Sequence, residues 1–385
     1  MANKEKLEKT SMEQFIDAEE FVSNSESNLS TEFTSLSLSL NNPSFSQSLG
    51  GLPEPASKSE TLDFGLEPPG QLTEGASLYE LCKTKVGSSK VQNKVTRSTP
   101  EELDQIVRAL APNIGDLMVD VFGNYMCQAL FHTCTSHQRI LLLNSMHSQL
   151  CLIAKHPIGT HSLQVLVSHS NLDLEEDIYK NSFKNHILEM SVHNHASYVI
   201  QKLLVVFKDQ EFIFRELRRN ACKVACRKLG ICVVKKCIRD PQIKDELLER
   251  SIELMQDPYG NYAIQQIVEV WREAVEFSIF NSITGKIPQL CIQKYSSNVM
   301  ETCFKLENLR HRILEELVNE GKISMLLNNP YGCYVLRTAV IEANDYQKSM
   351  LMTILINEMP NLHQKKLKPR WEEIMEHLTR SIKLF

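Results

Sequence analysis

A six-residue pattern recurs eight times between residues 87 and 337, and no other feature of the chain constrains its fold as strongly. Each copy has a Gly or another small residue, a polar or small residue, a flat or polar residue, two mostly apolar residues, and then Gln, Glu or a basic residue. The last positions of the copies are residues 92, 128, 164, 201, 235, 265, 301 and 337, which lie 30 to 37 residues apart. A period of this size predicts a stacked array of helical repeats rather than two or three separate cores.

The sequence around the pattern predicts helices and almost no strands. From about residue 75, apolar residues recur at helical spacing, and Pro and Gly stand singly between segments. These segments suit helices of roughly 8 to 18 residues. We therefore predict an all-α fold over residues 73–385, an α-solenoid of eight repeats followed by C-terminal capping helices.

Residues 1–72 differ from the rest in composition and charge. They are rich in Ser, Asn, Thr and Glu, and their scattered Leu and Phe residues show no helical period. Residues 1–75 hold 13 Asp or Glu and 4 Lys or Arg, a charge of −9, so the remainder of the chain carries +4 (−5 minus −9). We predict a disordered, acidic, Ser-rich tail, and a mildly basic body that suits an anionic ligand.

The 11 cysteines indicate a reducing compartment with buried free thiols, because their number is odd and the charged start of the chain is not a signal peptide. We therefore expect a cytoplasmic location and, since no run of about 18 apolar residues occurs, no membrane span. Zinc is an alternative for Cys222, Cys226, Cys232 and Cys237, but structural zinc prefers a tighter spacing than theirs. We expect no metal and no cofactor, and no enzymatic activity, because nucleotide-binding and hydrolase motifs are missing.

The pattern places three side chains where they can contact one base of a nucleic acid. Its small residue lets the chain turn sharply into a helix, as at Asp257-Pro258-Tyr259-Gly260. The second and sixth residues, which we name the first and second edge residues, lie four apart on one helical face. The third, the stacking residue, lies beside both, and the apolar pair faces the core. Two edge residues can pair with the edge of a base while the stacking residue packs on its face, and an unstacked single strand fits the spacing between repeats.

The ligand that this arrangement predicts is a single-stranded nucleic acid. The proposed edge residues are Ser88 and Gln92, Asn124 and Gln128, Thr160 and Gln164, Ser197 and Gln201, Lys235, Asn261 and Gln265, Ser297 and Glu301, and Cys333 and Arg337. The proposed stacking residues are Tyr125, His161, Tyr198, Cys232, Tyr262, Asn298 and Tyr334.

Over residues 75–385 this organisation resembles the Pumilio (PUF) family of RNA-binding proteins. The resemblance rests on Phe-Gly-Asn-Tyr-x-x-Gln at 122–128, Asp-Pro-Tyr-Gly-Asn-Tyr at 257–262 and Ser-Asn-x-x-Glu at 297–301. It implies a right-handed crescent of eight Pumilio-type repeats, with RNA running antiparallel to the protein on the concave side, one base per repeat. It also implies recognition of an mRNA 3′ untranslated region, and repression or decay through deadenylase or repressor proteins. Their expected binding surfaces are the convex face and the loop around Asn319–Ser324. We expect the protein to be a monomer.

The resemblance also implies a base preference for most repeats. Asn124/Gln128 and Asn261/Gln265 should bind uracil. Ser297/Glu301 should bind guanine, because a carboxylate accepts from the N1–H and N2–H₂ groups of guanine. The pairs expected to bind adenine are Ser88/Gln92, Thr160/Gln164 and Ser197/Gln201.

Two repeats depart from the family pattern. In the fifth, the side chain of Ile231 cannot form hydrogen bonds and Lys235 is a point charge, so we expect weak selectivity there, with Lys235 near a phosphate or a base acceptor. In the eighth, Cys333/Arg337 replaces the usual Asn/Gln pair for uracil. Arginine only donates, and cytosine offers two acceptors, so the preference is either C or U. The expected RNA site is 5′-(C/U)GUNAAUA.

Two other functions remain open on the sequence. A helical array can also be a protein-binding scaffold of the HEAT or armadillo kind. A PUF relative that acts in ribosome biogenesis and binds nucleic acid without sequence preference is the other alternative. Regular edge residues in the second, sixth and seventh repeats favour sequence-specific RNA binding over both.

Overall fold

The computed structural model divides the chain into two units, residues 1–72 and 73–385. It describes residues 75–319, 321–358 and 368–382, all of which belong to the second unit. The predicted disordered tail lies outside the described residues. Within those residues every regular element is an α-helix or a short 3₁₀-helix. The predicted all-α solenoid is confirmed.

Each repeat consists of three helices: a short connecting helix, an inner helix that carries the six-residue pattern, and an outer helix. The connecting helices are α2 (Gly75–Cys82), α5 (Ile114–Val119), α8 (Leu150–Lys155), α11 (Ile187–Val192), α14 (Ala221–Ala225), α17 (Ser251–Met255), α20 (Ile287–Cys291) and α23 (Ile323–Leu327). The inner helices are α3 (Lys85–Val95), α6 (Gly123–Thr133), α9 (Gly159–His169), α12 (Ala196–Val206), α15 (Gly230–Cys237), α18 (Gly260–Trp271), α21 (Ser296–Phe304) and α24 (Gly332–Glu342). The outer helices are α4 (Pro100–Leu110), α7 (Ser136–Met146), α10 (Asp173–Phe183), α13 (Glu211–Leu217), α16 (Pro241–Glu249), α19 (Glu276–Ile283), α22 (Glu307–Asn319) and α25 (Asp345–Glu358).

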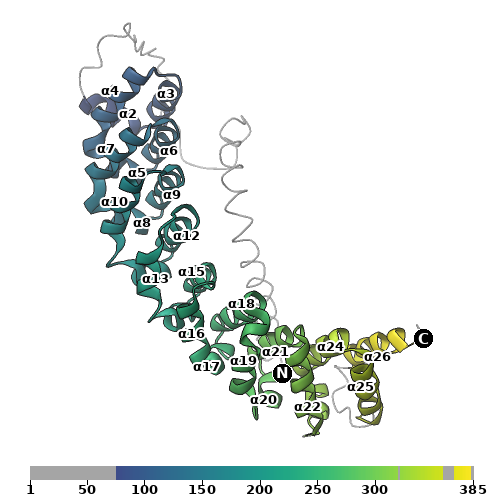
Figure 1. Ribbon diagram of the computed structural model, residues 1–385. Coiled ribbons are helices and arrows are strands. Elements are labelled where there is room, and N and C mark those ends of the chain that lie inside the picture. The colour runs from purple at the N-terminus through teal and green to yellow at the C-terminus, as the bar shows by residue number, and fades with distance from the viewer. Residues whose placement is uncertain (1–74, 320, 359–367, 383–385) are drawn as a thin grey trace, which may run out of the picture. The chain divides into compact units, whose positions relative to one another are not determined.

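Successive repeats stack side by side, because each inner helix packs against the inner helix of the next repeat. Within the second unit the repeats follow a curved row, and the inner helices line its hollow side (Figure 1). The 3₁₀-helices η2 (Ala111–Asn113), η3 (His147–Gln149) and η4 (Arg272–Val275) join neighbouring elements, and a last helix, α26 (Lys368–Ile382), packs on α24 and α25. One continuous core of buried apolar side chains runs through the row. Each repeat therefore depends on its neighbours for burial.

Local sequence signals fix where the outer helices begin. Thr99 and Glu102 form a reciprocal capping box at the start of α4, whose first residue is Pro100. Thr135 and Gln138 form another at the start of α7. Such boxes satisfy backbone N–H groups that the first turn of a helix cannot pair internally. On α4 the apolar residues at helical spacing, from Leu103 to Leu110, are buried against the neighbouring elements.

The small residue at the start of the pattern is required by close backbone packing. A Cβ atom placed on Gly332 would lie 2.6 Å from the carbonyl oxygen of Leu326, at the end of the preceding short helix. In the seventh repeat this position is Ser296, whose hydroxyl group donates to the carbonyl of Leu290 at 2.7 Å. The predicted helix start at this residue is confirmed in repeats 2 to 8. It is wrong in the first repeat, where α3 begins at Lys85, two residues before Gly87, because Thr84 caps the helix through the Gly87 N–H.

Candidate functional site

All of the proposed edge and stacking residues lie on inner helices, which the structure aligns along one side of the row. In repeats 2 to 8 the first edge position is the second residue of the helix, and the second edge position follows one turn later. The apolar pair between them is buried, as Met126 and Cys127 show on α6. Each repeat therefore has the helical face that the pattern predicts. Because the inner helices stack, the eight faces lie next to one another along the row.

The first edge residues are less accessible than the pattern suggested. They are almost fully buried, with exposed fractions of at most 5%: Ser88, Asn124, Thr160, Ser197, Ile231, Asn261, Ser297 and Cys333. The Asn124 amide donates to the carbonyls of Asp120 and Val121 at 3.0 and 2.9 Å, and Asn261 makes the equivalent two bonds on α18. These side chains are anchored to the turn that leads into the inner helix.

The second edge residues hydrogen-bond to the first edge residues of the same repeat in several places. Gln265 Nε2 donates to Asn261 Oδ1 at 2.8 Å, and Gln128 makes the same bond to Asn124 at 3.1 Å. Gln92 and Gln164 donate to the hydroxyl groups of the edge residues Ser88 and Thr160 at 3.0 and 3.2 Å. An anchored first residue thus orients the terminal amide of the second. The fourth repeat differs, because the Ser197 hydroxyl is fully buried and has no hydrogen-bond partner among the described residues.

The stacking residues are more accessible than the first edge residues beside them. Tyr125 is 38% exposed and Tyr334 is 42% exposed, and His161 is also exposed. The other four are half-buried: Tyr198, Cys232, Tyr262 and Asn298. Flat side chains at this depth can offer a face to a ligand while the edge residues remain anchored.

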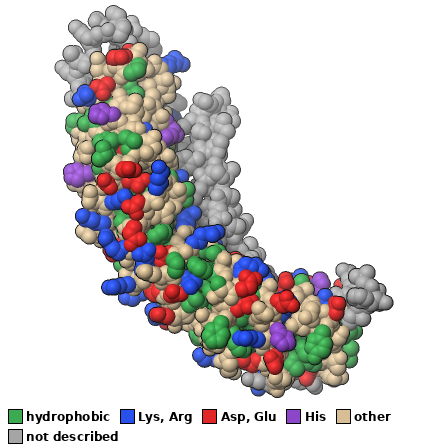
Figure 2. Space-filling model, in the orientation of Figure 1, with side chains coloured by type: hydrophobic (Ala, Val, Ile, Leu, Met, Phe, Trp, Pro, Cys, Tyr) green, Lys and Arg blue, Asp and Glu red, His purple; other side chains and the backbone are tan. Residues whose placement is uncertain are grey.

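The fifth repeat has the weakest hydrogen-bonding set but a positive environment. Ile231 is 2% exposed and apolar, whereas Lys235 is half-buried at the second edge position. Burial, together with the charge of the adjacent Lys236, lowers the pKa of Lys202 on the neighbouring inner helix α12. Lys and Arg side chains, interspersed with Asp and Glu, also lie around the middle of the row, over α13 to α16 (Figure 2). The two edge positions of the fifth repeat thus offer one cationic side chain and one apolar side chain.

Contacts with neighbouring elements reach the second edge residues of the sixth, seventh and eighth repeats, and the pattern did not predict them. Thr302 Oγ1 donates to Gln265 at 3.4 Å, and Thr338 Oγ1 donates to Glu301 Oε2 at 2.8 Å. Both threonines directly follow a second edge residue, and that position is the signal that could have identified them. Arg337 Nε donates at 2.6 Å to Glu373 on α26, the helix that follows the eighth repeat.

The cysteines considered for zinc are free thiols. Burial raises the pKa of Cys222 to about 12, and it raises the pKa of Cys226 to about 11, with help from the nearby Asp257. Such thiols are poor nucleophiles, since the thiolate is the reactive form. Among the described residues, no three or more His, Cys, Asp or Glu side chains form a group that could hold a metal ion.

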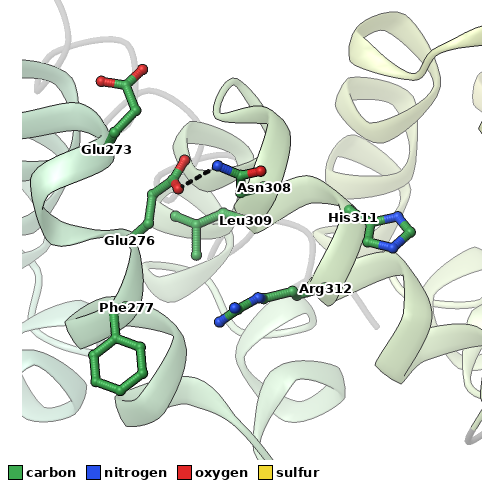
Figure 3. A pocket seen from close by; sticks show the side chains of 7 residues that line it. All are labelled: Glu273, Glu276, Phe277, Asn308, Leu309, His311 and Arg312. Atoms are coloured by element: carbon green, nitrogen blue, oxygen red, sulfur yellow. Dashed lines mark hydrogen bonds between the residues drawn. The ribbon is translucent and has the colours of Figure 1, made fainter.

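A hollow of about 390 Å³ lies between neighbouring repeats on the outer helices. It is lined by Glu273, Glu276, Phe277, Asn308, Leu309, His311 and Arg312 (Figure 3). Asn308 Nδ2 donates to Glu276 Oε2 at 2.9 Å, and the guanidinium group of Arg312 lies 4.9 Å from the ring of Phe280. Phe277 is 70% exposed, so the hollow has an accessible aromatic side chain at its rim.

Comparison with known protein families identifies the repeats. Six stretches match the Pumilio-family RNA binding repeat, at residues 77–111, 113–147, 186–217, 251–284, 286–318 and 323–356. These stretches make up more than half of the chain. The chain belongs to the Pumilio family. The third and fifth repeats fall between the matched stretches, and the fifth is where Ile231 and Lys235 replace the usual edge residues.

Curated Pumilio proteins resemble this chain over most of its length. Pumilio homolog 12 of Arabidopsis thaliana is 27% identical over 288 residues, which cover 71% of this chain and 48% of the relative. A Pumilio domain-containing protein of Schizosaccharomyces pombe is 26% identical over 299 residues, covering 75% of this chain and 44% of the relative. The matched region thus spans about half the length of these relatives.

None of the described helices combines the length and the apolar composition of a membrane span.

Solved structures share the fold. The Puf4 RNA-binding domain, bound to the recognition sequence of the HO endonuclease RNA 3′ untranslated region, matches with a TM-score of 0.72 and 28% identity, covering 77% of this chain and 97% of that domain. The structure of PUF-8 in complex with PBE-RNA matches with a TM-score of 0.69 and 22% identity, covering 79% of this chain and 92% of that chain. The second match supports the fold alone.

Proposed function

We propose that this protein binds single-stranded RNA along its inner helices and distinguishes RNA sequences at about one base per repeat. The observation that carries this proposal is the alignment of eight edge-and-stacking sets on consecutive, packed inner helices. The structural match to a Puf domain that was solved with an RNA recognition sequence supports it. An enzyme-like site is not needed for this function, because recognition requires only hydrogen bonding and stacking.

Recognition by the edge residues is an exchange of hydrogen bonds. In the free chain Gln265 donates to Asn261, and Gln128 donates to Asn124. A base that enters must replace such a bond with its own acceptors and donors, so the net gain per bond is small, about 1 kcal/mol. A mismatched base that breaks such a bond without replacing it leaves a half-buried amide unsatisfied, which costs more than a matched base gains. The difference in binding free energy between a matched and a mismatched base should therefore be larger than the free energy gained from a matched contact.

The proposed site, from the eighth repeat to the first, is 5′-(C/U)GUNAAUA. Guanine at the second position pairs with Glu301, whose carboxylate is half-buried and already oriented by Thr338. Uracil at the third and seventh positions pairs with the Asn/Gln sets on α18 and α6. The fourth position is unselective because Ile231 offers no hydrogen bond. The three adenines correspond to the Ser/Gln and Thr/Gln sets.

The consequence of binding is proposed to be post-transcriptional. The natural target would be an mRNA 3′ untranslated region, as in the RNA complex of the Puf4 domain. We propose that this monomeric, cytoplasmic protein acts through deadenylase or repressor proteins on its outer side, where the hollow beside Phe277 presents an exposed aromatic group. The segment around Asn319–Ser324, after α22, is the second proposed surface for such partners, and its described residues Asn319 and Gly321 are exposed.

The edge residues of the seventh repeat give a direct test. In the full chain, Ser297→Ala with Glu301→Ala should weaken binding to the proposed site by about 1–3 kcal/mol and abolish the preference for guanine over adenine at the second position. Fluorescence anisotropy with two RNAs that differ only at that base measures both quantities. The matched control, Asn124→Ala with Gln128→Ala, should alter selection only at the seventh position.

The cellular consequence can be tested with the same variant. A reporter mRNA that carries the site should be repressed by the wild-type protein and not by the seventh-repeat variant. Unchanged affinity and unchanged preference for guanine in that variant would contradict the assignment of the edge residues.

A further inference from the structure

The last helix, α26, repeats the spacing of the inner helices once more. Glu373 lies 36 residues after Arg337, and Arg370 lies 36 residues after Tyr334, the same interval that separates most neighbouring repeats. Helix α26 packs against α24 as the inner helices pack against one another. Arg370 therefore occupies the stacking position, and Glu373 the second edge position, of a ninth unit that lacks the other features of the pattern.

Both of these residues contact the edge-and-stacking set of the eighth repeat. Arg337 Nε donates to Glu373 Oε1 at 2.6 Å, and each of the two side chains remains about two-fifths exposed. The guanidinium group of Arg370 lies 4.3 Å from the ring of Tyr334, and its Nη1 donates to the carbonyl of Pro330 at 3.0 Å. Two charged residues of α26 thus contact the ligand-facing residues of the eighth repeat.

The contact to Glu373 restricts the orientation of the Arg337 guanidinium group. A guanidinium group is planar and carries its donors in a fixed fork. When Nε is held by a carboxylate, the end of the fork, with Nη1 and Nη2, is the part that can be directed toward a ligand. Two donors side by side match two acceptors side by side.

We propose that Glu373 sets the base preference of the eighth repeat by fixing Arg337 in the orientation that selects cytosine at the first position of the site. Cytosine presents N3 and O2 as adjacent acceptors, whereas uracil presents an N3–H donor beside O2. The end of the fork can pair with both acceptors of cytosine and meets a like donor on uracil. This inference rests on the proposed RNA binding, and Glu373 acts as a positioning residue through Arg337.

Three variants of the full chain separate this role from a structural one. Glu373→Ala removes the acceptor, Glu373→Gln keeps an amide oxygen that can accept from Nε, and Glu372→Ala changes the exposed neighbour on the same helix. Each protein is titrated with RNAs that differ only in the first base, C or U, and with a pair that differs only in the second base, G or A.

We expect the wild-type protein to bind the C-containing RNA about tenfold more tightly than the U-containing RNA, the usual size of one well-formed bidentate base contact. The Glu373→Ala variant should lose most of this ratio, while Glu373→Gln and Glu372→Ala should keep it. The preference for G over A should be unchanged in all four proteins, which shows that the variants are folded and bind in register.

The outcomes distinguish the two proposals. A wild-type protein with no preference for G at the second position would contradict the proposed function itself. A wild-type protein that selects G but prefers U at the first position, or a Glu373→Ala variant that keeps the full C-over-U ratio, would overturn the role of Glu373 and leave RNA binding in place.

Discussion

One side chain in most repeats accepts two backbone N–H groups at the turn before the inner helix. Asp120, Asp257 and Asn329 do so through a side-chain oxygen, at distances of 2.7 to 3.0 Å. In the third and fourth repeats the acceptor is the Nδ1 atom of His156 and of His193, at 3.2 to 3.4 Å. A histidine can accept at Nδ1 only when that nitrogen carries no proton.

We predict that His193 makes the turn of the fourth repeat sensitive to pH. Burial, followed by the charges of His195 and Lys155, lowers its pKa below the usual 6.5. Because the folded state favours neutral His193, its contribution to stability is present above pH 6.5 and is lost as the pH falls through the lowered pKa. When the pH is lowered from about 7.5 to about 5, the free energy of unfolding should fall less in the His193→Asp variant than in the wild type. The difference should be about 1 kcal/mol, the usual contribution of a helix cap.

Thermal unfolding at the two pH values measures this difference. His137→Asn, at an exposed position on α7, provides the control and should follow the wild type. An equal loss of stability on acidification in the wild-type and His193→Asp proteins would rule out this turn as the sensitive group.

For individual residues, the sequence predicted the positions of the edge residues but not how their side chains pack. The positions of the edge residues follow from helical periodicity, since residues four apart share a face. The burial of Asn124 and Asn261, and their bonds to carbonyls of the preceding turn, depend on the close approach of two helices. A pattern of residue types carries no information on that approach, so an anchoring role was not predicted.

Buried arginines join outer helices of neighbouring repeats at two junctions. Between α7 and α10, Arg139 Nε donates to Glu175 at 2.7 Å and Nη1 donates to the carbonyl of Cys134. Between α22 and α25, Arg310 Nε donates to Gln347 at 3.2 Å and Nη1 donates to the carbonyl of Phe304. Nε and Nη1 donate to the same kinds of position at both junctions, but the acceptor of Nε is a carboxylate at one junction and an amide at the other.

The first junction should depend on its acceptor more than on its charge. Arg139 and Glu175 have side-chain exposures of 6% and 0%, so removal of the Glu175 side chain leaves the buried guanidinium group without its hydrogen-bonded acceptor. We expect Glu175→Ala to cost about 3–5 kcal/mol of unfolding free energy. Glu175→Gln should cost distinctly less, because the Arg310–Gln347 junction shows that an amide can take this place.

Urea denaturation followed by circular dichroism compares the two variants with the wild type. Equal losses for the Ala and Gln variants would show that charge, and not the hydrogen-bonded acceptor, stabilises the junction. The buried arginines gave no signal in the sequence, because an isolated Arg in a helix is ordinarily a surface residue.

For the whole molecule, the period of about 36 residues was enough to predict the stacked array and the helical face that carries the site. The row of three-helix repeats follows from that period and from helical spacing. The contribution of α26 could not be predicted in the same way. Arg370 and Glu373 keep the interval, but Lys368 and Pro369 replace the small and polar residues that begin the pattern, so only the contacts to Tyr334 and Arg337 reveal the ninth unit.

The central claim is that the inner helices select an RNA sequence. The most direct measurement is selection of bound molecules by the full chain from a random pool of single-stranded RNA, followed by sequencing. The account predicts enrichment of a G-U step that is followed, after one unselective position, by an A/U-rich stretch, with C as the base before the G. No enrichment, or equal binding of duplex RNA and single-stranded DNA, would contradict the account and would make the row of repeats a scaffold for protein partners.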